Sequence, residues 1–155
     1  MALSQEQLAT LKADILADPT LSAWAATGRM AQEIADEYNK LASPAFVVWR
    51  TEVQPDEWRA AIIGGGGATQ LDALMASKRE SLLWAVEGVL DPSKAAIRAA
   101  LDDFCGSQNN LKAAIQAVEK RNATRAERLF STGTGSTASP ARMTFEGALT
   151  YQDVE

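Results

Sequence analysis

The sequence predicts a mainly α-helical protein, an irregular bundle of five or six helices with a short β element and an extended C-terminal arm ending in a strand. Three observations support this. Alanine, the strongest helix former, is the commonest residue. Apolar residues recur at helical spacing between start and stop signals over most of residues 1–130. Residues 131–140 are, apart from Ala138, a run of Ser, Thr, Gly and Pro, a composition typical of linkers, and residues 141–155 form the arm beyond them.

The first third of the chain carries three helical segments and one β segment. They are expected over residues 4–17, 21–26, 29–41 and 45–50. Ser4 and Gln7 form a capping box, and Asp18-Pro19 ends the first helix because the residue before a proline avoids helical geometry. The β segment is rich in β-branched and aromatic side chains. It is either a short strand or an extended connection packed on helices.

The remainder of the body is predicted to be helical as well. Helices are expected to start near Gln54-Pro55, Thr69 and Asp91-Pro92, and a last one spans residues 111–130. The run Gly64–Gly67 interrupts them and superficially resembles a phosphate-binding loop. The preceding segment reads as helix, however, no second parallel strand follows, and a P-loop lysine is missing. We therefore expect a flexible hinge, with a small nucleotide-binding module as an alternative.

Residues 142–151 alternate between apolar and polar side chains. The apolar set is Met143, Phe145, Gly147, Leu149 and Tyr151. Period two is typical of a half-buried strand. An isolated strand leaves its backbone groups unpaired, so it needs a partner either at residues 45–50 or in a neighbouring molecule. A helical body, a linker and a terminal strand together favour an assembly subunit over an enzyme.

Composition excludes several classes of function. The chain of 155 residues has no histidine and one cysteine, which removes Ser-His-Asp catalysis, internal disulfides and cysteine or histidine zinc sites. Its net charge of −5 makes nucleic acid unsuited as the main partner. No secretory signal and no apolar run of about 20 residues is present, so we expect no membrane partner and folding in a reducing cytoplasm. We expect no catalytic residue, no cofactor and no metal.

Several residues are candidates for contacts with a partner. If residues 111–130 are helical, one face of the helix carries Arg121, Arg125 and Arg128. This face is either a salt-bridged, solvent-exposed surface or a docking site for an acidic partner. Phe145, Leu149 and Tyr151 are the candidate anchors of the arm. The four tryptophans, Trp24, Trp49, Trp58 and Trp84, belong either to the core or to a partly exposed subunit interface. Cys105 is expected to be a buried, inert thiol.

Four sequence segments resemble small proteins encoded among the structural genes of tailed bacteriophages and prophages. They are Val48-Trp-Arg-Thr51, Gly88-Val-Leu-Asp-Pro-Ser-Lys94, Ala123-Thr-Arg-Ala-Glu-Arg-Leu-Phe-Ser-Thr-Gly-Thr-Gly135 and Met143-Thr-Phe-Glu-Gly147. The resemblance covers most of the chain outside residues 60–76, where the glycine run replaces an aromatic, polar stretch. It carries no catalytic residues.

This resemblance implies a structural role in the virion. Small helical phage proteins of this size are often head–tail adaptors, which sit in a ring below the portal and have extended terminal arms. The expected function is therefore a neck subunit, made in the host cytoplasm, that oligomerises in a ring and docks through its arm. Its partners would be other copies of itself, the portal, and neck or tail proteins. The alternatives are a capsid decoration protein, a tail or fibre-attachment protein, and a nucleotide-binding module using Gly64–Gly67.

Overall fold

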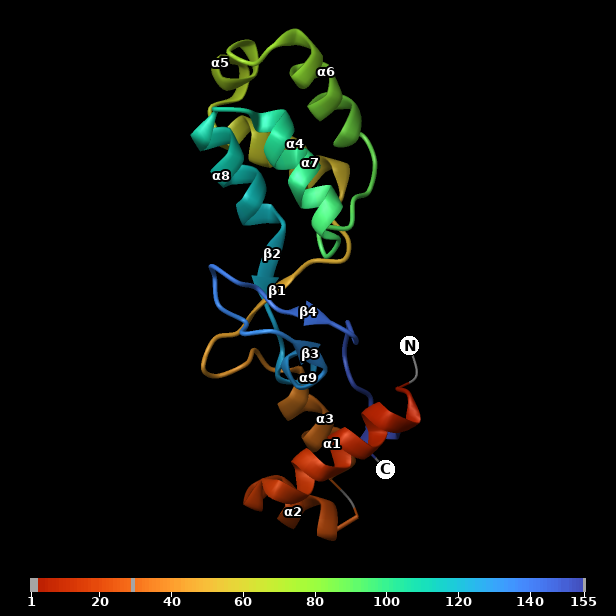
Figure 1. Ribbon diagram of the computed structural model, residues 1–155. Helices are drawn as coiled ribbons and strands as arrows, with labels where there is room; N and C mark the ends of the chain where they lie inside the picture. The colour runs from red at the N-terminus through yellow and green to blue at the C-terminus, as the bar shows by residue number, and fades with distance from the viewer. Residues whose placement is uncertain (1–2, 29, 155) are drawn as a thin grey trace. The chain divides into compact units, whose positions relative to one another are not determined.

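The computed structural model describes residues 3–28 and 30–154 (Figure 1). The chain forms two compact units: unit 1 comprises Met1–Val48 and Asn122–Glu155, and unit 2 comprises Trp49–Arg121. Unit 2 is thus an insertion into the sequence of unit 1. This division differs from the predicted body, linker and arm, because the C-terminal residues belong to the same unit as the N-terminal helices.

Unit 1 contains the N-terminal and C-terminal helices. Its elements are α1 (Gln5–Ala17), α2 (Pro19–Ala26), α3 (Ala31–Asn39), α9 (Arg125–Leu129), β3 (Ser131–Thr132), β4 (Arg142–Met143) and α10 (Tyr151–Val154). The predicted Ser4–Gln7 capping box starts α1. Asp18 ends α1 and also caps α2, accepting hydrogen bonds from the N–H groups of Thr20 and Leu21 at 3.0 and 3.2 Å. The boundaries of α1 are as predicted, whereas α2 begins at Pro19 and not at Leu21, because Asp18 caps it.

The core of unit 1 draws on both ends of the chain. Leu11, Leu21, Ile34 and Tyr38 are buried in one cluster that also contains the C-terminal side chains Phe130, Phe145 and Leu149. The predicted strand over residues 142–151 is wrong, because pairing ends at Met143 and residues 151–154 are helical. Phe145 and Leu149 instead pack on the helices of the same unit. The backbone finds its partners within the chain, because the Thr144 N–H donates to the Phe130 carbonyl and the Leu149 N–H and C=O pair with the Asn39 side chain.

The predicted linker is an ordered connection between two paired strands. β3 pairs antiparallel with β4, with Ser131 opposite Met143. Within the connection, the carbonyl of Gly135 accepts a hydrogen bond of 2.7 Å from the Val47 N–H. Gly135 has a φ of +65°, and a Cβ at this position would lie 2.1 Å from Phe46 Cε2. Only glycine fits there, so this Gly/Ser/Thr run is built for packing rather than for flexibility.

Unit 2 is a group of five helices. They are α4 (Pro55–Gly64), α5 (Gly67–Asp72), α6 (Ala76–Ala85), α7 (Ala95–Cys105) and α8 (Asn109–Val118). Trp58, Leu82, Leu101, Leu111 and Ile115 are among its fully buried side chains. The glycine run lies at the junction of α4 and α5. A Cβ on Gly65 would lie 2.9 Å from Ala114 Cβ in α8, so this glycine lets the two helices approach closely.

The described residues form ten short helices instead of five or six, because two predicted helices are interrupted, the segment before Ala26 is a full helix, and the end of the predicted strand is helical. The helix expected from Thr69 to Gly88 breaks at residues 73–75, where Leu74 is buried in the core of unit 2. The helix expected over 111–130 ends at Val118, and the chain then forms β2 (Lys120–Asn122), which pairs with β1 (Val47–Trp49). The mainly α prediction is nevertheless confirmed, as is the short β element at residues 45–50.

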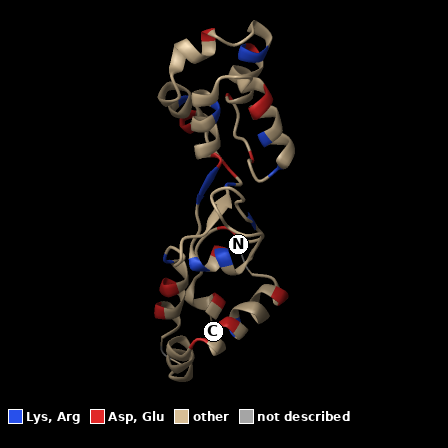
Figure 2. Cartoon of the chain, turned by 60° about the vertical axis from the view of Figure 1, so that its left-hand side comes forward, with Lys and Arg blue, Asp and Glu red and all other residues tan. Residues whose placement is uncertain are grey.

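None of the described helices is both long and apolar enough to cross a bilayer. Basic and acidic residues are interspersed along the helices of each unit (Figure 2).

Candidate interaction site

The three candidate arginines do not share a helix face. Arg121 lies in β2 of unit 2, whereas Arg125 and Arg128 lie in α9 of unit 1. The predicted face fails because the backbone of residues 120–122 pairs with a strand, and a new capping box between Thr124 and Glu127 then starts α9. Each arginine has to be considered in its own surroundings.

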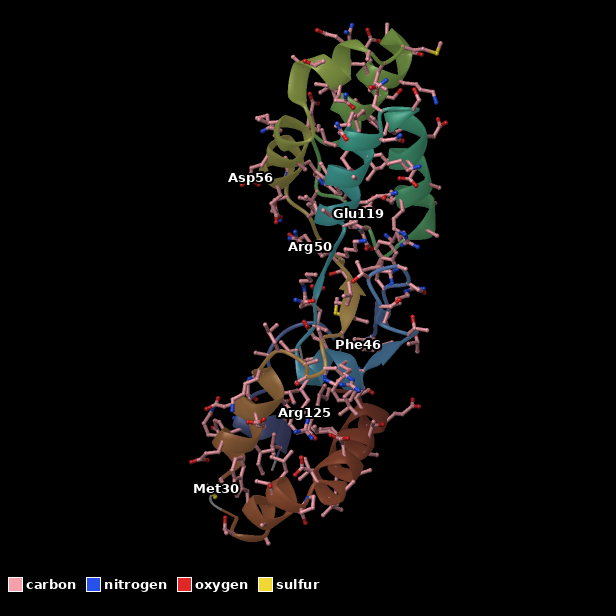
Figure 3. All side chains as sticks on the ribbon, turned by 90° about the vertical axis from the view of Figure 1, so that its left-hand side faces the viewer. Met30, Phe46, Arg50, Asp56, Glu119 and Arg125 are labelled. Carbon is pink, nitrogen blue, oxygen red and sulfur yellow. The ribbon has the colours of Figure 1, made fainter. Side chains whose placement is uncertain are left out.

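Arg125 holds three helices of unit 1 together (Figure 3). Its Nη2 donates to Asp14 Oδ2 at 3.3 Å and to Asp18 Oδ2 at 3.2 Å, and its guanidinium lies 4.7 Å from the centre of the Tyr38 ring. The Tyr38 hydroxyl donates to the same Asp14 carboxylate. Burial and the Asp14 hydrogen bond raise the pKa of Tyr38, so it stays protonated. Arg125 is therefore engaged inside its own unit.

Arg128 is the exposed arginine of α9. Its guanidinium lies 5.6 Å from the Phe46 ring centre and donates to the Ser43 carbonyl at 3.4 Å. No carboxylate of a described residue pairs with it. It borders a hollow of about 480 Å³, which we call the α9 hollow, lined by Asp14, Glu37, Lys40, Leu41, Ala42, Ser43, Arg125, Arg128 and Leu129. Leu41 is 66% exposed at this hollow.

The remaining cations of the α9 hollow are neutralised locally. Lys40 contacts Glu37 at 2.5 Å, and Arg125 is shared between Asp14 and Asp18. Arg128 is thus the cation of this hollow that has no carboxylate partner among the described residues.

The candidate anchors of the arm divide into two kinds. Phe145 and Leu149 are buried in the core of unit 1, and Phe145 packs edge-on against Phe130 with ring centres 5.5 Å apart. They are therefore not available to a neighbour in this structure, because their own unit already buries them. Tyr151 in α10 is 47% exposed and remains accessible.

The structure separates the four tryptophans. Trp58 is fully buried and Trp24 packs against the core of unit 1. Trp49 carries the Arg98 guanidinium 4.0 Å from its ring centre. Trp84, near the end of α6, is 77% exposed. A large aromatic ring in water is costly, and aromatic residues are enriched at the centre of protein interfaces.

Exposed apolar and acidic residues accompany Trp84 along the second half of α6 and the turn after it, and we call them the Trp84 surface: Glu80, Leu83, Trp84, Glu87 and Val89. Leu83 and Val89 are both exposed. Glu80 lies one helical turn before Trp84, and the Glu87 N–H donates to the Trp84 carbonyl at 3.3 Å. No ion pair joins either glutamate to a described residue.

The cations of α6 do not offset this negative charge. Lys78 contacts Asp103 at 2.8 Å and Arg79 contacts Asp72 at 3.2 Å. The Trp84 surface therefore combines three exposed apolar side chains with two carboxylates that have no ion-pair partner among the described residues.

Two side chains of unit 2, Glu119 and Cys105, have pKa values well above their usual ones. Glu119 is buried, its Oε1 has no hydrogen-bond partner, and burial together with Asp102 raises its pKa to about 7. Burial raises the pKa of Cys105 to about 11, so this thiol is buried, as the sequence predicted, and un-ionised at neutral pH. In the described part of the chain, no three acidic or cysteine side chains gather in an arrangement that would hold a metal ion.

No protein-family model, curated protein or solved structure matches the chain.

The sequence did not predict that Trp84 is exposed or that Glu119 is buried. Leu82, Leu83, Trp84 and Val86 are apolar on all sides of α6, so periodicity does not say which of them points outward. The available signal was the pair of glutamates at positions 80 and 87, which lie close to Trp84 on a helix. Glu119 gave no signal, because it lies within a charged run that reads as solvent-exposed.

Proposed function

We propose that this chain is a structural subunit of a tailed-phage virion, most specifically a neck or head–tail adaptor subunit that oligomerises in a ring. The observation that carries the proposal is the Trp84 surface: a 77% exposed tryptophan beside exposed Leu83 and Val89. Such a patch is unfavourable on a free monomer and typical of a surface covered by another protein. The four segments that resemble phage structural proteins supply the virion context.

The mode of docking differs from a free C-terminal arm. Phe145 and Leu149 support the fold of unit 1, so contacts between subunits are assigned to exposed groups: the Trp84 surface, Arg128 and Tyr151. Repetition of a modest contact around a closed ring produces a stable assembly. Capsid decoration and fibre attachment use the same kind of surface and differ in where the particle carries the subunit.

Removing the gene from the phage and imaging the particles by electron microscopy tests this proposal. An adaptor role predicts filled heads and complete tails that remain separate, with infectivity restored by a plasmid copy of the gene. Tailed particles with fragile capsids would instead support decoration, and tailed particles lacking fibres would support attachment. Particles of normal morphology and infectivity would contradict a structural role.

A further inference from the structure

The Trp84 surface has the properties of a projecting contact. Trp84 is 77% exposed on α6, and the carboxylates of Glu80 and Glu87 beside it have no partner among the described residues. A partner for this surface must provide an apolar recess for an indole and a positive charge at its edge. A flat acidic or neutral surface would leave the two carboxylates desolvated and unpaired.

The α9 hollow of the same chain meets both requirements. Its volume of about 480 Å³ is walled in part by Leu41, Ala42 and Leu129, and Leu41 is itself exposed. Arg128 at its edge has no carboxylate partner among the described residues. A guanidinium in this position pairs with a carboxylate and also stacks on an aromatic ring.

A second hollow of about 480 Å³ in unit 1 is less suited. It lies among α1, α2, α3 and α10 and is lined mainly by apolar residues, with Lys12 and Asp153 as its charged groups. This hollow has a single cation, Lys12, and no arginine. The α9 hollow has Arg128, a guanidinium without a carboxylate partner among the described residues, and this group distinguishes the two hollows.

We propose that the Trp84 surface of one copy of this chain docks into the α9 hollow of a second copy, with Trp84 in the recess and Glu80 and Glu87 facing Arg128. The two surfaces belong to different units of the chain, so the contact is heterologous. Each copy then has one free projection and one free hollow, and repetition produces a ring or a filament instead of a closed dimer. The self-contact stands on the two surfaces alone, whereas its use in a virion ring rests on the proposed function.

Sedimentation velocity of the purified full chain over a concentration series measures this contact. We expect concentration-dependent association of the wild type, and we expect Trp84→Ser and Arg128→Glu each to weaken it at least about 30-fold, the loss associated with an interface hot spot. The matched controls are Ile63→Ser, which removes an apolar side chain that is 74% exposed, and Arg59→Glu, which reverses an exposed arginine in unit 2. Both controls should associate like the wild type.

Mixing the two defective variants gives the most specific result. The Trp84→Ser chain retains an intact hollow and the Arg128→Glu chain retains an intact projection, so an equimolar mixture should form a one-to-one heterodimer that grows no further. This outcome also shows that both variants are folded. A contact between two identical Trp84 surfaces would give no heterodimer, and that result would overturn the inference.

The remaining outcomes are equally decisive. A wild type that stays monomeric up to about 1 mM, a concentration that reveals even weak association, would overturn the self-contact. Association that survives both Trp84→Ser and Arg128→Glu would overturn these surfaces while leaving ring formation in place. The proposed virion role fails separately, by absence of the chain from the particle.

Discussion

Replacing Phe145 by alanine tests whether the C-terminal segment is part of the fold or a free arm. Phe145 is buried in the core of unit 1 and packs edge-on against Phe130, with ring centres 5.5 Å apart and planes at 71°. Truncating a buried phenylalanine costs about 3–5 kcal/mol, of which the aromatic pair supplies about 0.5–1.5 kcal/mol. Since small domains are stable by only about 5–15 kcal/mol, this loss is a large fraction of the total.

Urea unfolding followed by far-UV circular dichroism measures this loss, and hydrogen exchange of residues 31–39 locates it in unit 1. The matched control is Tyr151→Ala in the same segment, where a half-exposed side chain should cost less than about 1 kcal/mol. If Phe145→Ala also costs less than about 1 kcal/mol, the segment is not packed as described, and the free-arm interpretation regains its support. Deleting residues 141–155 is a poorer test, because it removes core side chains along with any docking group.

Three further predictions concern single sites. Arg125→Lys should lower the free energy of unfolding by about 1–2 kcal/mol in urea titrations, because lysine lacks the planar guanidinium that lies over the Tyr38 ring while its Nη2 donates to both Asp14 and Asp18. Gly65→Ala should lower the free energy of unfolding by about 1–3 kcal/mol, since its Cβ would lie 2.9 Å from Ala114 Cβ. Gly64→Ala is the matched control, because its Cβ would meet nothing within 4 Å, and it should be neutral or stabilising by up to about 1 kcal/mol. Equal melting temperatures for the two variants would contradict the packing role of Gly65. The pKa of Glu119 is raised to about 7 in the fold, so its contribution to stability is complete below its unfolded pKa and is lost as the pH rises through 7. Glu119→Gln should therefore stabilise the protein at pH 8 by up to about 3 kcal/mol and change little at pH 4, and a pH-independent difference would refute this account.

Local signals predicted much of the secondary structure. The Ser4–Gln7 capping box and Pro55 start helices where expected, because these residues satisfy or tolerate the free N–H groups of a first turn without help from the rest of the fold. The β segment near Val48 was also predicted, since its β-branched side chains favour an extended backbone.

The elements that the sequence did not predict depend on contacts between segments far apart in the chain. Residues 120–122 have no strand signal of their own, and they leave the helical path because β1 offers them backbone partners. The period-two pattern of residues 142–151 predicted a half-buried strand with Phe145 and Leu149 as anchors for a neighbour, but a segment that packs on the helices of its own unit satisfies the same pattern. Of the candidate interface residues, Arg128 and Tyr151 stay accessible, and the exposed position of Trp84 emerged only once α6 had neighbours.

The central claim, that this chain is a structural component of a virion, is tested most directly by quantitative mass spectrometry of purified particles, counting copies of the chain relative to the major capsid protein. The account predicts a count on the order of ten per particle, as a single closed ring requires. A count in the hundreds would place the subunit on the capsid or along the tail. Absence from the particle would contradict the structural role altogether.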